Sequence, residues 1–151
     1  MSGANGTLTK ETKYKTIVQN FVNAWNAGDL GTAFSAWAPD IIHHSRLSDN
    51  KIEGIELSFD IFMRAFPNIH IKVNDMVAEG NKVVSFFTVT GTHVGEFMGK
   101  PATGKQISWS SVDISVFNED DKVCEHWGLY DEMSIFSQVG LLPIEFLASM
   151  S

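Results

Sequence analysis

The hydrophobic pattern of this 151-residue chain changes period once, near residue 69, and this change restricts the possible folds more than any other feature. Before it, apolar residues recur at spacings of three and four, which predicts amphipathic helices. After it, Ile69, Ile71 and Val73 begin an alternation of apolar and polar residues that is typical of strands. Helices followed by a run of strands indicate an α+β fold.

Each predicted helix is an apolar stripe that ends at a glycine or a proline. The helices before the change are expected at about residues 14–27, 30–38 and 55–66. The strands are expected at about residues 69–78, 82–92, 106–117 and 122–130, and Asp131 is expected to cap a last short helix. We therefore predict an α+β domain in which a strongly curved, cone-shaped antiparallel sheet wraps around three N-terminal helices.

Composition limits the partners and the surroundings of the chain. The formal charge is −7 with only 11 Lys and Arg, which argues against binding to nucleic acid and favours a small, neutral or weakly ionic molecule. The apolar runs are too short to cross a bilayer, and the N-terminus lacks the apolar core of a signal peptide. We expect one cytoplasmic domain over residues 1–151, with residues 1–8 flexible and no membrane partner.

The segment VDISVFNEDDKVCEHWG, residues 112–128, predicts a hairpin with Asp113 on one arm and His126 on the other. If Phe117 faces Lys122 across a symmetric turn, Asp113 lies directly opposite His126 on the same face. A loop one residue longer or shorter would separate the two residues onto opposite faces. Five further residues would share their face, a mixture that suits a ligand cavity: Trp109, Ser111, Cys124, Gly128 and Tyr130.

An aspartate beside a histidine can fix the ring tautomer and raise the proton affinity of the imidazole. The histidine can then act as a general acid or base near neutral pH, which typically contributes about 10²- to 10⁴-fold in rate. The alternative is that Asp113 and His126 only satisfy each other's hydrogen bonds. Both interpretations stay open on sequence alone.

Other polar residues are weaker candidates. Adjacent His43 and His44 should point in opposite directions on an extended segment, and His44 is expected to be the one in the pocket. His93 could reach a ligand from a loop, although a loop histidine is more often solvated, and His70 should face outward. The histidine spacing matches no metal motif, so we predict no metal site. The stretch GKPATGKQ imitates a phosphate-binding loop, but a strand follows it instead of a helix.

Several segments are similar to a known family: GTHVGEFMG, PATGK, EHWGLYD and QVGLLP, with AWNAGDL and APDIIHH nearer the N-terminus. Through these segments most of the chain resembles the SnoaL-like polyketide cyclase and ester cyclase family, within the nuclear transport factor 2-like superfamily. The resemblance implies a cone-shaped α+β barrel, a deep apolar pocket, no cofactor, and a homodimer formed through the outer sheet face.

The resemblance also implies intramolecular aldol cyclisation with a carboxylate as acid and base. The family's functional histidine aligns with Asp113 and its catalytic aspartate with Gly128, so the family machinery is not reproduced residue by residue. We expect cofactor-free cyclisation, isomerisation or dehydration of a hydrophobic carbonyl-bearing or polycyclic molecule of secondary metabolism, with epoxide hydrolysis as a related option. Asp113 and His126 are the expected catalytic residues, and His44, Trp25, Phe62, Met98 and Trp109 the expected pocket residues. A non-catalytic ligand carrier or dimeric association module is the alternative.

Overall fold

The computed structural model describes residues 8–45, 52–143, 145, 148 and 149. The expected flexible segment at residues 1–8 lies outside this part of the chain, apart from Leu8. No described helix is both long enough and apolar enough to span a membrane.

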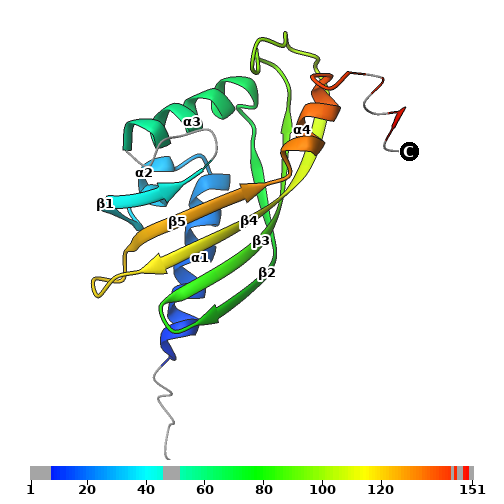
Figure 1. Cartoon of the computed structure of the whole chain (residues 1–151). Helices are drawn as coiled ribbons and strands as arrows, with labels where there is room; N and C mark the ends of the chain where they lie inside the picture. The colour runs from blue at the N-terminus through cyan, green and yellow to red at the C-terminus, as the bar shows by residue number, and fades with distance from the viewer. Residues whose placement is uncertain (1–7, 46–51, 144, 146–147, 150–151) are drawn as a thin grey trace, which may run out of the picture.

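Helices and strands occur in the predicted order, with one additional strand. The helices are α1 (Lys10–Asn26), α2 (Leu30–Phe34), α3 (Ile52–Ala65) and α4 (Glu132–Val139). The strands are β1 (Trp37–His44), β2 (His70–Glu79), β3 (Lys82–Thr92), β4 (Gln106–Phe117) and β5 (Val123–Tyr130). Figure 1 shows a curved sheet with α1 behind it, which confirms the predicted α+β fold.

The strands form one sheet in the order β1-β5-β4-β3-β2. Strands β2 to β5 are antiparallel neighbours, as predicted, whereas β1 pairs with β5 in parallel. The sequence prediction assigned Trp37 to a helix ending at Pro39, and this assignment was wrong. Helix α2 ends at Phe34, and Pro39 lies inside β1, where an edge strand tolerates its missing N–H.

Helix α1 places its apolar stripe against the inner face of the sheet. Thr9 caps its N-terminus by accepting from the backbone N–H of Thr12, and four residues of the stripe are buried: Tyr14, Val18, Val22 and Trp25. The Tyr14 ring stacks on Phe117 of β4, with ring centroids 4.1 Å apart. The core therefore lies between this helix and the concave side of the sheet (Figure 1).

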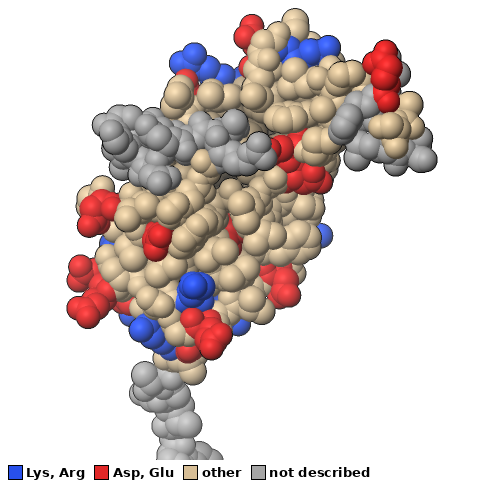
Figure 2. Space-filling model, in the orientation of Figure 1, with Lys and Arg blue, Asp and Glu red and all other residues tan. Residues whose placement is uncertain are grey.

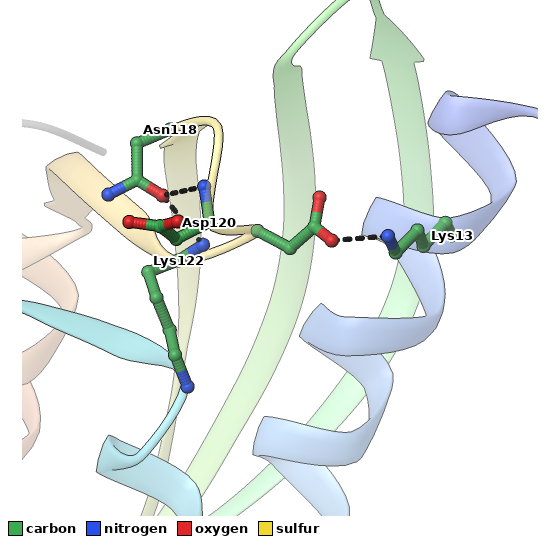
Figure 3. A network of polar contacts seen from close by, with 5 residues as sticks. Lys13, Asn118, Asp120 and Lys122 are labelled. Atoms are coloured by element: carbon green, nitrogen blue, oxygen red, sulfur yellow. Dashed lines mark hydrogen bonds and ion pairs between the residues drawn. The ribbon is translucent and has the colours of Figure 1, made fainter.

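The turn between β4 and β5 has a defined hydrogen-bond pattern (Figure 3). The Asn118 side chain accepts from the backbone N–H groups of Asp120 and Lys122, each at 3.0 Å. Asp121 adopts a left-handed conformation with φ 59°, and its carboxylate pairs with Lys13 of α1. This turn is one residue longer than the sequence prediction assumed, because Phe117 faces Val123 and not Lys122.

The loop between β3 and β4 packs onto the end of α3. The backbone N–H groups of Val94 and Gly95 both donate to the carbonyl of Ala65. A Cβ atom at Gly95 would lie 2.1 Å from the Arg64 carbonyl oxygen, so only glycine permits this approach. The strand predicted after GKPATGK is present, since β4 begins at Gln106.

Candidate functional site

The register of β4 and β5 places Asp113 and His126 on the same face of the sheet, although the two residues are not paired as predicted. Asp113 faces Gly128, and His126 faces Ser115. The predicted register differs from the observed one by two residues. The longer turn accounts for one of them. A bulge at Cys124, between the pairs Val116–Glu125 and Phe117–Val123, accounts for the other. Two shifts of one residue restore the original face, because side chains alternate with a period of two.

Asp113 and His126 are in contact despite this diagonal placement. Asp113 Oδ2 lies 3.1 Å from His126 Nε2, while Asp113 Oδ1 accepts a hydrogen bond from the Ser111 hydroxyl at 2.8 Å. The His126 side chain is nearly buried, with 9% exposed, whereas 25% of the Asp113 side chain is exposed. The carboxylate therefore holds one edge of the imidazole and is itself held by a neighbouring residue on its own strand.

A second histidine completes a chain of polar groups. The parallel pairing of β1 with β5 sets His43 beside His126, and the two Nδ1 atoms lie 2.9 Å apart. The two rings are nearly parallel, with centroids 5.0 Å apart, and Trp37 packs against both. Asp113, His126 and His43 thus form a continuous series of polar contacts across three strands.

Protonation of His43 is strongly disfavoured. Burial, with the charge of the neighbouring His126 as the second cause, lowers the pKa of His43 to about 4. Two imidazolium rings that face each other through Nδ1–H groups would also lose their mutual hydrogen bond. His43 is therefore a neutral ring at physiological pH, with one protonated and one unprotonated nitrogen.

These residues border a cavity of about 150 Å³ whose surface is mostly apolar and includes five aromatic side chains. Its described walls are Trp25, His43, Ser45, Ser58, Phe59, Phe62, Ile69, Trp109, Ser111, Asp113, His126, Gly128 and Tyr130. A cavity of about this size holds a single small aromatic ring such as benzene. The cavity can bind an apolar group of a ligand in contact with a small number of polar atoms.

Three of the predicted pocket walls line this cavity, namely Trp25, Phe62 and Trp109. Met98 was wrongly predicted to be a fourth, since it lies at the tip of the β3–β4 loop with 52% of its surface exposed. Its positive φ of 50° belongs to the tight turn that bridges Phe97 and Lys100. Loop curvature of this kind is not visible in a hydrophobic pattern.

The pocket histidine is His43, and the prediction of His44 was wrong. The ring of His44 stacks on Trp127 and its Nε2 lies 2.9 Å from the Glu125 carboxylate, on the outer face of the sheet. Two isoleucines precede the two histidines, so the alternation in this segment fits either phase. Only the pairing of His43 with His126 in the sheet decides between them.

The remaining polar candidates lie outside the cavity. Cys124, at the bulge, borders a different recess near Tyr14 and Phe117. His70 is exposed, as predicted, whereas His93 is completely buried, and the Thr103 backbone N–H donates to its Nδ1. Asp131 caps α4, as predicted, by accepting from the Ser134 backbone N–H. Within the described residues no group of three or more His, Cys, Asp or Glu side chains could hold a metal ion.

The curved sheet, its inner helix and the enclosed polar residues define a small α+β protein with a pocket at the sheet's concave face. The model of the SnoaL-like polyketide cyclase family matches residues 15–139, and the chain belongs to this family. Among curated proteins no match was found.

Solved structures of similar proteins cover nearly the same length. AclR of Streptomyces galilaeus, a proposed hydroxylase, is 33% identical, with a TM-score of 0.82 over 89% of this chain and 100% of its own. TsrD of Streptomyces laurentii is 26% identical, with a TM-score of 0.74 over 90% of this chain and 100% of its own. IdmH of Streptomyces antibioticus, a proposed polyketide cyclase, is 26% identical, with a TM-score of 0.72 over 85% of this chain and 99% of its own.

Proposed function

We propose that the protein is a cofactor-free enzyme that moves protons on a hydrophobic, carbonyl-bearing small molecule of secondary metabolism. The observation that carries this proposal is the contact between Asp113 and His126 inside the aromatic cavity. A fixed imidazole beside an apolar ligand space is suited to removing a proton next to a carbonyl and returning it elsewhere. Aldol cyclisation, isomerisation and dehydration all begin with such a step, and each of them would make the enzyme a lyase or an isomerase.

The position of Gly128 argues for a reaction that differs in detail from that of the family's aldol cyclases. A Cβ atom there would lie 3.7 Å from His126 Cε1 and 3.8 Å from His43 Cε1. The carboxylate that the family resemblance implies at this position would therefore project directly over both rings. Here that space is open, and the imidazoles take the role of the proton-transfer group.

Exchange of α-protons is the direct test. The monocyclic ketone cyclohexanone carries exchangeable protons beside its carbonyl and serves as the probe, with loss of their NMR signals in D₂O as the readout. We expect His126→Phe to slow enzyme-dependent exchange at least tenfold, because it removes one imidazole from the series of polar groups that moves the proton. His70→Phe, at an exposed position on β2, is the matched control and should keep the wild-type rate.

Two outcomes would contradict this function. A protein that binds cyclohexanone but exchanges its protons no faster than buffer does would be a ligand carrier, the non-catalytic alternative. If wild type and His126→Phe exchanged the protons at the same rate, Asp113 and His126 would have no part in the reaction. Circular dichroism of each variant establishes that the fold is retained before rates are compared.

The 33% identity to AclR favours a second candidate function, hydroxylation. Deprotonation of an electron-rich ring or an enolisable ketone in the same cavity would then precede reaction with O₂. One oxygen atom enters the product and the other leaves as water, so the reaction requires O₂ and a two-electron reductant as co-substrates. Oxygen uptake in the presence of a substrate distinguishes the two, because cyclisation and isomerisation consume no oxygen. Anaerobic activity would exclude hydroxylation.

We also propose that the protein is a homodimer formed through the outer face of the sheet. Across this face Phe86, Val112 and Leu129 occupy one row of paired positions on neighbouring strands. Phe86 is 43% and Leu129 57% exposed, which is unusual for two large apolar side chains in the same row of a sheet. Figure 2, which views this face, shows mostly residues that are neither acidic nor basic over the sheet, with many of the charged ones toward its rim.

A further inference from the structure

We propose that His43 is the catalytic residue that exchanges a proton with the substrate, and that His126 and Asp113 are positioning residues that receive and hold the resulting charge. The catalytic role rests on the proposed function. The arrangement of protons among the three side chains follows from their geometry alone.

The hydrogen-bond series fixes which nitrogen of each ring carries a proton. A carboxylate offers only acceptors, so His126 must donate from Nε2 to Asp113 Oδ2 across 3.1 Å. In its neutral form the ring has a single N–H, and its Nδ1 is therefore an acceptor. The contact between the two Nδ1 atoms at 2.9 Å then requires His43 to donate from Nδ1.

This assignment leaves Nε2 of His43 as an unprotonated nitrogen. His43 is a wall of the cavity, and no hydrogen bond to its Nε2 is found among the residues that the structure describes. The nitrogens of His126, in contrast, both face protein partners. Of the two rings, only His43 can accept a proton from a ligand without first breaking a hydrogen bond in the series.

The series also explains how a ring with so low a proton affinity could act as a base. When His43 Nε2 takes a proton from the substrate, its own Nδ1 proton can pass to Nδ1 of His126. His43 then remains neutral with a proton on Nε2, and the positive charge rests on His126 beside the Asp113 carboxylate. The electron pair of the broken C–H bond stays on the substrate as an enolate, and the reverse transfer returns the proton from His43 Nε2 to an alkoxide or carbon.

Burial supports this division of roles. His43 on its own has its pKa lowered to about 4 by burial and by His126, which would make an isolated base weak at neutral pH. His126, in contrast, lies in hydrogen-bond contact with the Asp113 carboxylate, whose second oxygen accepts from Ser111, so a negative group stands beside the ring that receives the proton.

The tautomers can be measured on the full chain without a substrate. Long-range ¹H–¹⁵N correlation spectra of the protein labelled with ¹⁵N-histidine distinguish the protonated from the unprotonated nitrogen of each neutral ring. At pH 7.5 we expect His43 to be protonated on Nδ1 and His126 on Nε2. A proton on Nε2 of His43 together with an unprotonated Nδ1 would overturn the proposal.

Proton exchange of cyclohexanone then tests the role of His43 in catalysis. We expect His43→Phe to slow exchange at least tenfold while leaving the fold intact, with His70→Phe again as the control. A wild-type rate in His43→Phe, with loss of activity only in His126→Phe, would show that His126 meets the substrate directly and would overturn the proposal. If the wild type itself does not exchange, the proposed function fails, whereas the expected tautomers would still support the arrangement of the three side chains.

Discussion

At the scale of single residues, the chemistry depends on very few polar side chains in an otherwise apolar interior. The sequence identified Asp113 and His126 because both lie on arms of a hairpin with a clear acidic turn. It did not identify His43, because the neighbouring isoleucines and histidines fit both phases of a strand equally well. The partner that settles the phase, His126, lies 83 positions away along the chain.

Burial of His43 makes the stability of the protein depend on pH. In the folded protein His43 stays neutral down to about pH 4, whereas in the unfolded chain it takes up a proton near its ordinary pKa of 6.5. Between these values the unfolded state binds more protons, so the free energy of unfolding should decrease as the pH falls from about 6.5 to about 4. The full loss attributable to this residue is on the order of 3 kcal/mol.

Urea denaturation at intervals between pH 7 and pH 4 measures this dependence. His43→Phe should lose less free energy of unfolding across the interval than the wild type does, since the buried imidazole is gone. His70→Phe removes an exposed histidine and serves as the matched variant. Identical pH dependence in the wild type and His43→Phe would contradict the assignment of a buried, neutral ring.

At the scale of elements, the hairpin prediction gave the correct face from an incorrect register. The turn is one residue longer than assumed, and the bulge at Cys124 adds another residue to β5. Neither feature has a strong signal in the sequence. The turn, for example, depends on Asp121, a non-glycine residue that adopts a left-handed conformation. Strand β1 was missed for a related reason, since parallel pairing between distant segments leaves no local pattern.

The junction between α3 and the β3–β4 loop tests how tightly the elements are fitted together. Gly95→Ala should lower the free energy of unfolding by about 1–3 kcal/mol or more, because its methyl group would meet the Arg64 carbonyl oxygen. Gly31→Ala in α2 is the matched control, since a Cβ there would lie 3.8 Å from its nearest neighbour, the carboxylate of the N-cap Asp29. Chemical denaturation compares the two, and a Gly95→Ala protein as stable as the wild type would show that the loop can move away.

At the scale of the whole molecule, the two faces of the sheet differ in what covers them. Its inner face packs on α1 and encloses the cavity, and its periodic apolar residues made that side predictable from the sequence. Its outer face also carries apolar residues, such as Val77, Phe86 and Leu129, which no described helix covers. An outer face of this composition is what a symmetric interface between two copies requires, because each residue then meets the same patch on its partner.

Introducing charge on this face should dissociate the proposed dimer. Leu129→Glu places two carboxylates in an interface of two chains that already carry a formal charge of −7 each, so both repulsion and desolvation oppose association. Met98→Glu makes the same change of charge at an exposed loop tip and should leave the dimer intact. Sedimentation equilibrium at micromolar concentration measures the mass: a monomeric wild type, or a Leu129→Glu variant as dimeric as the Met98→Glu control, would exclude the sheet face as the interface.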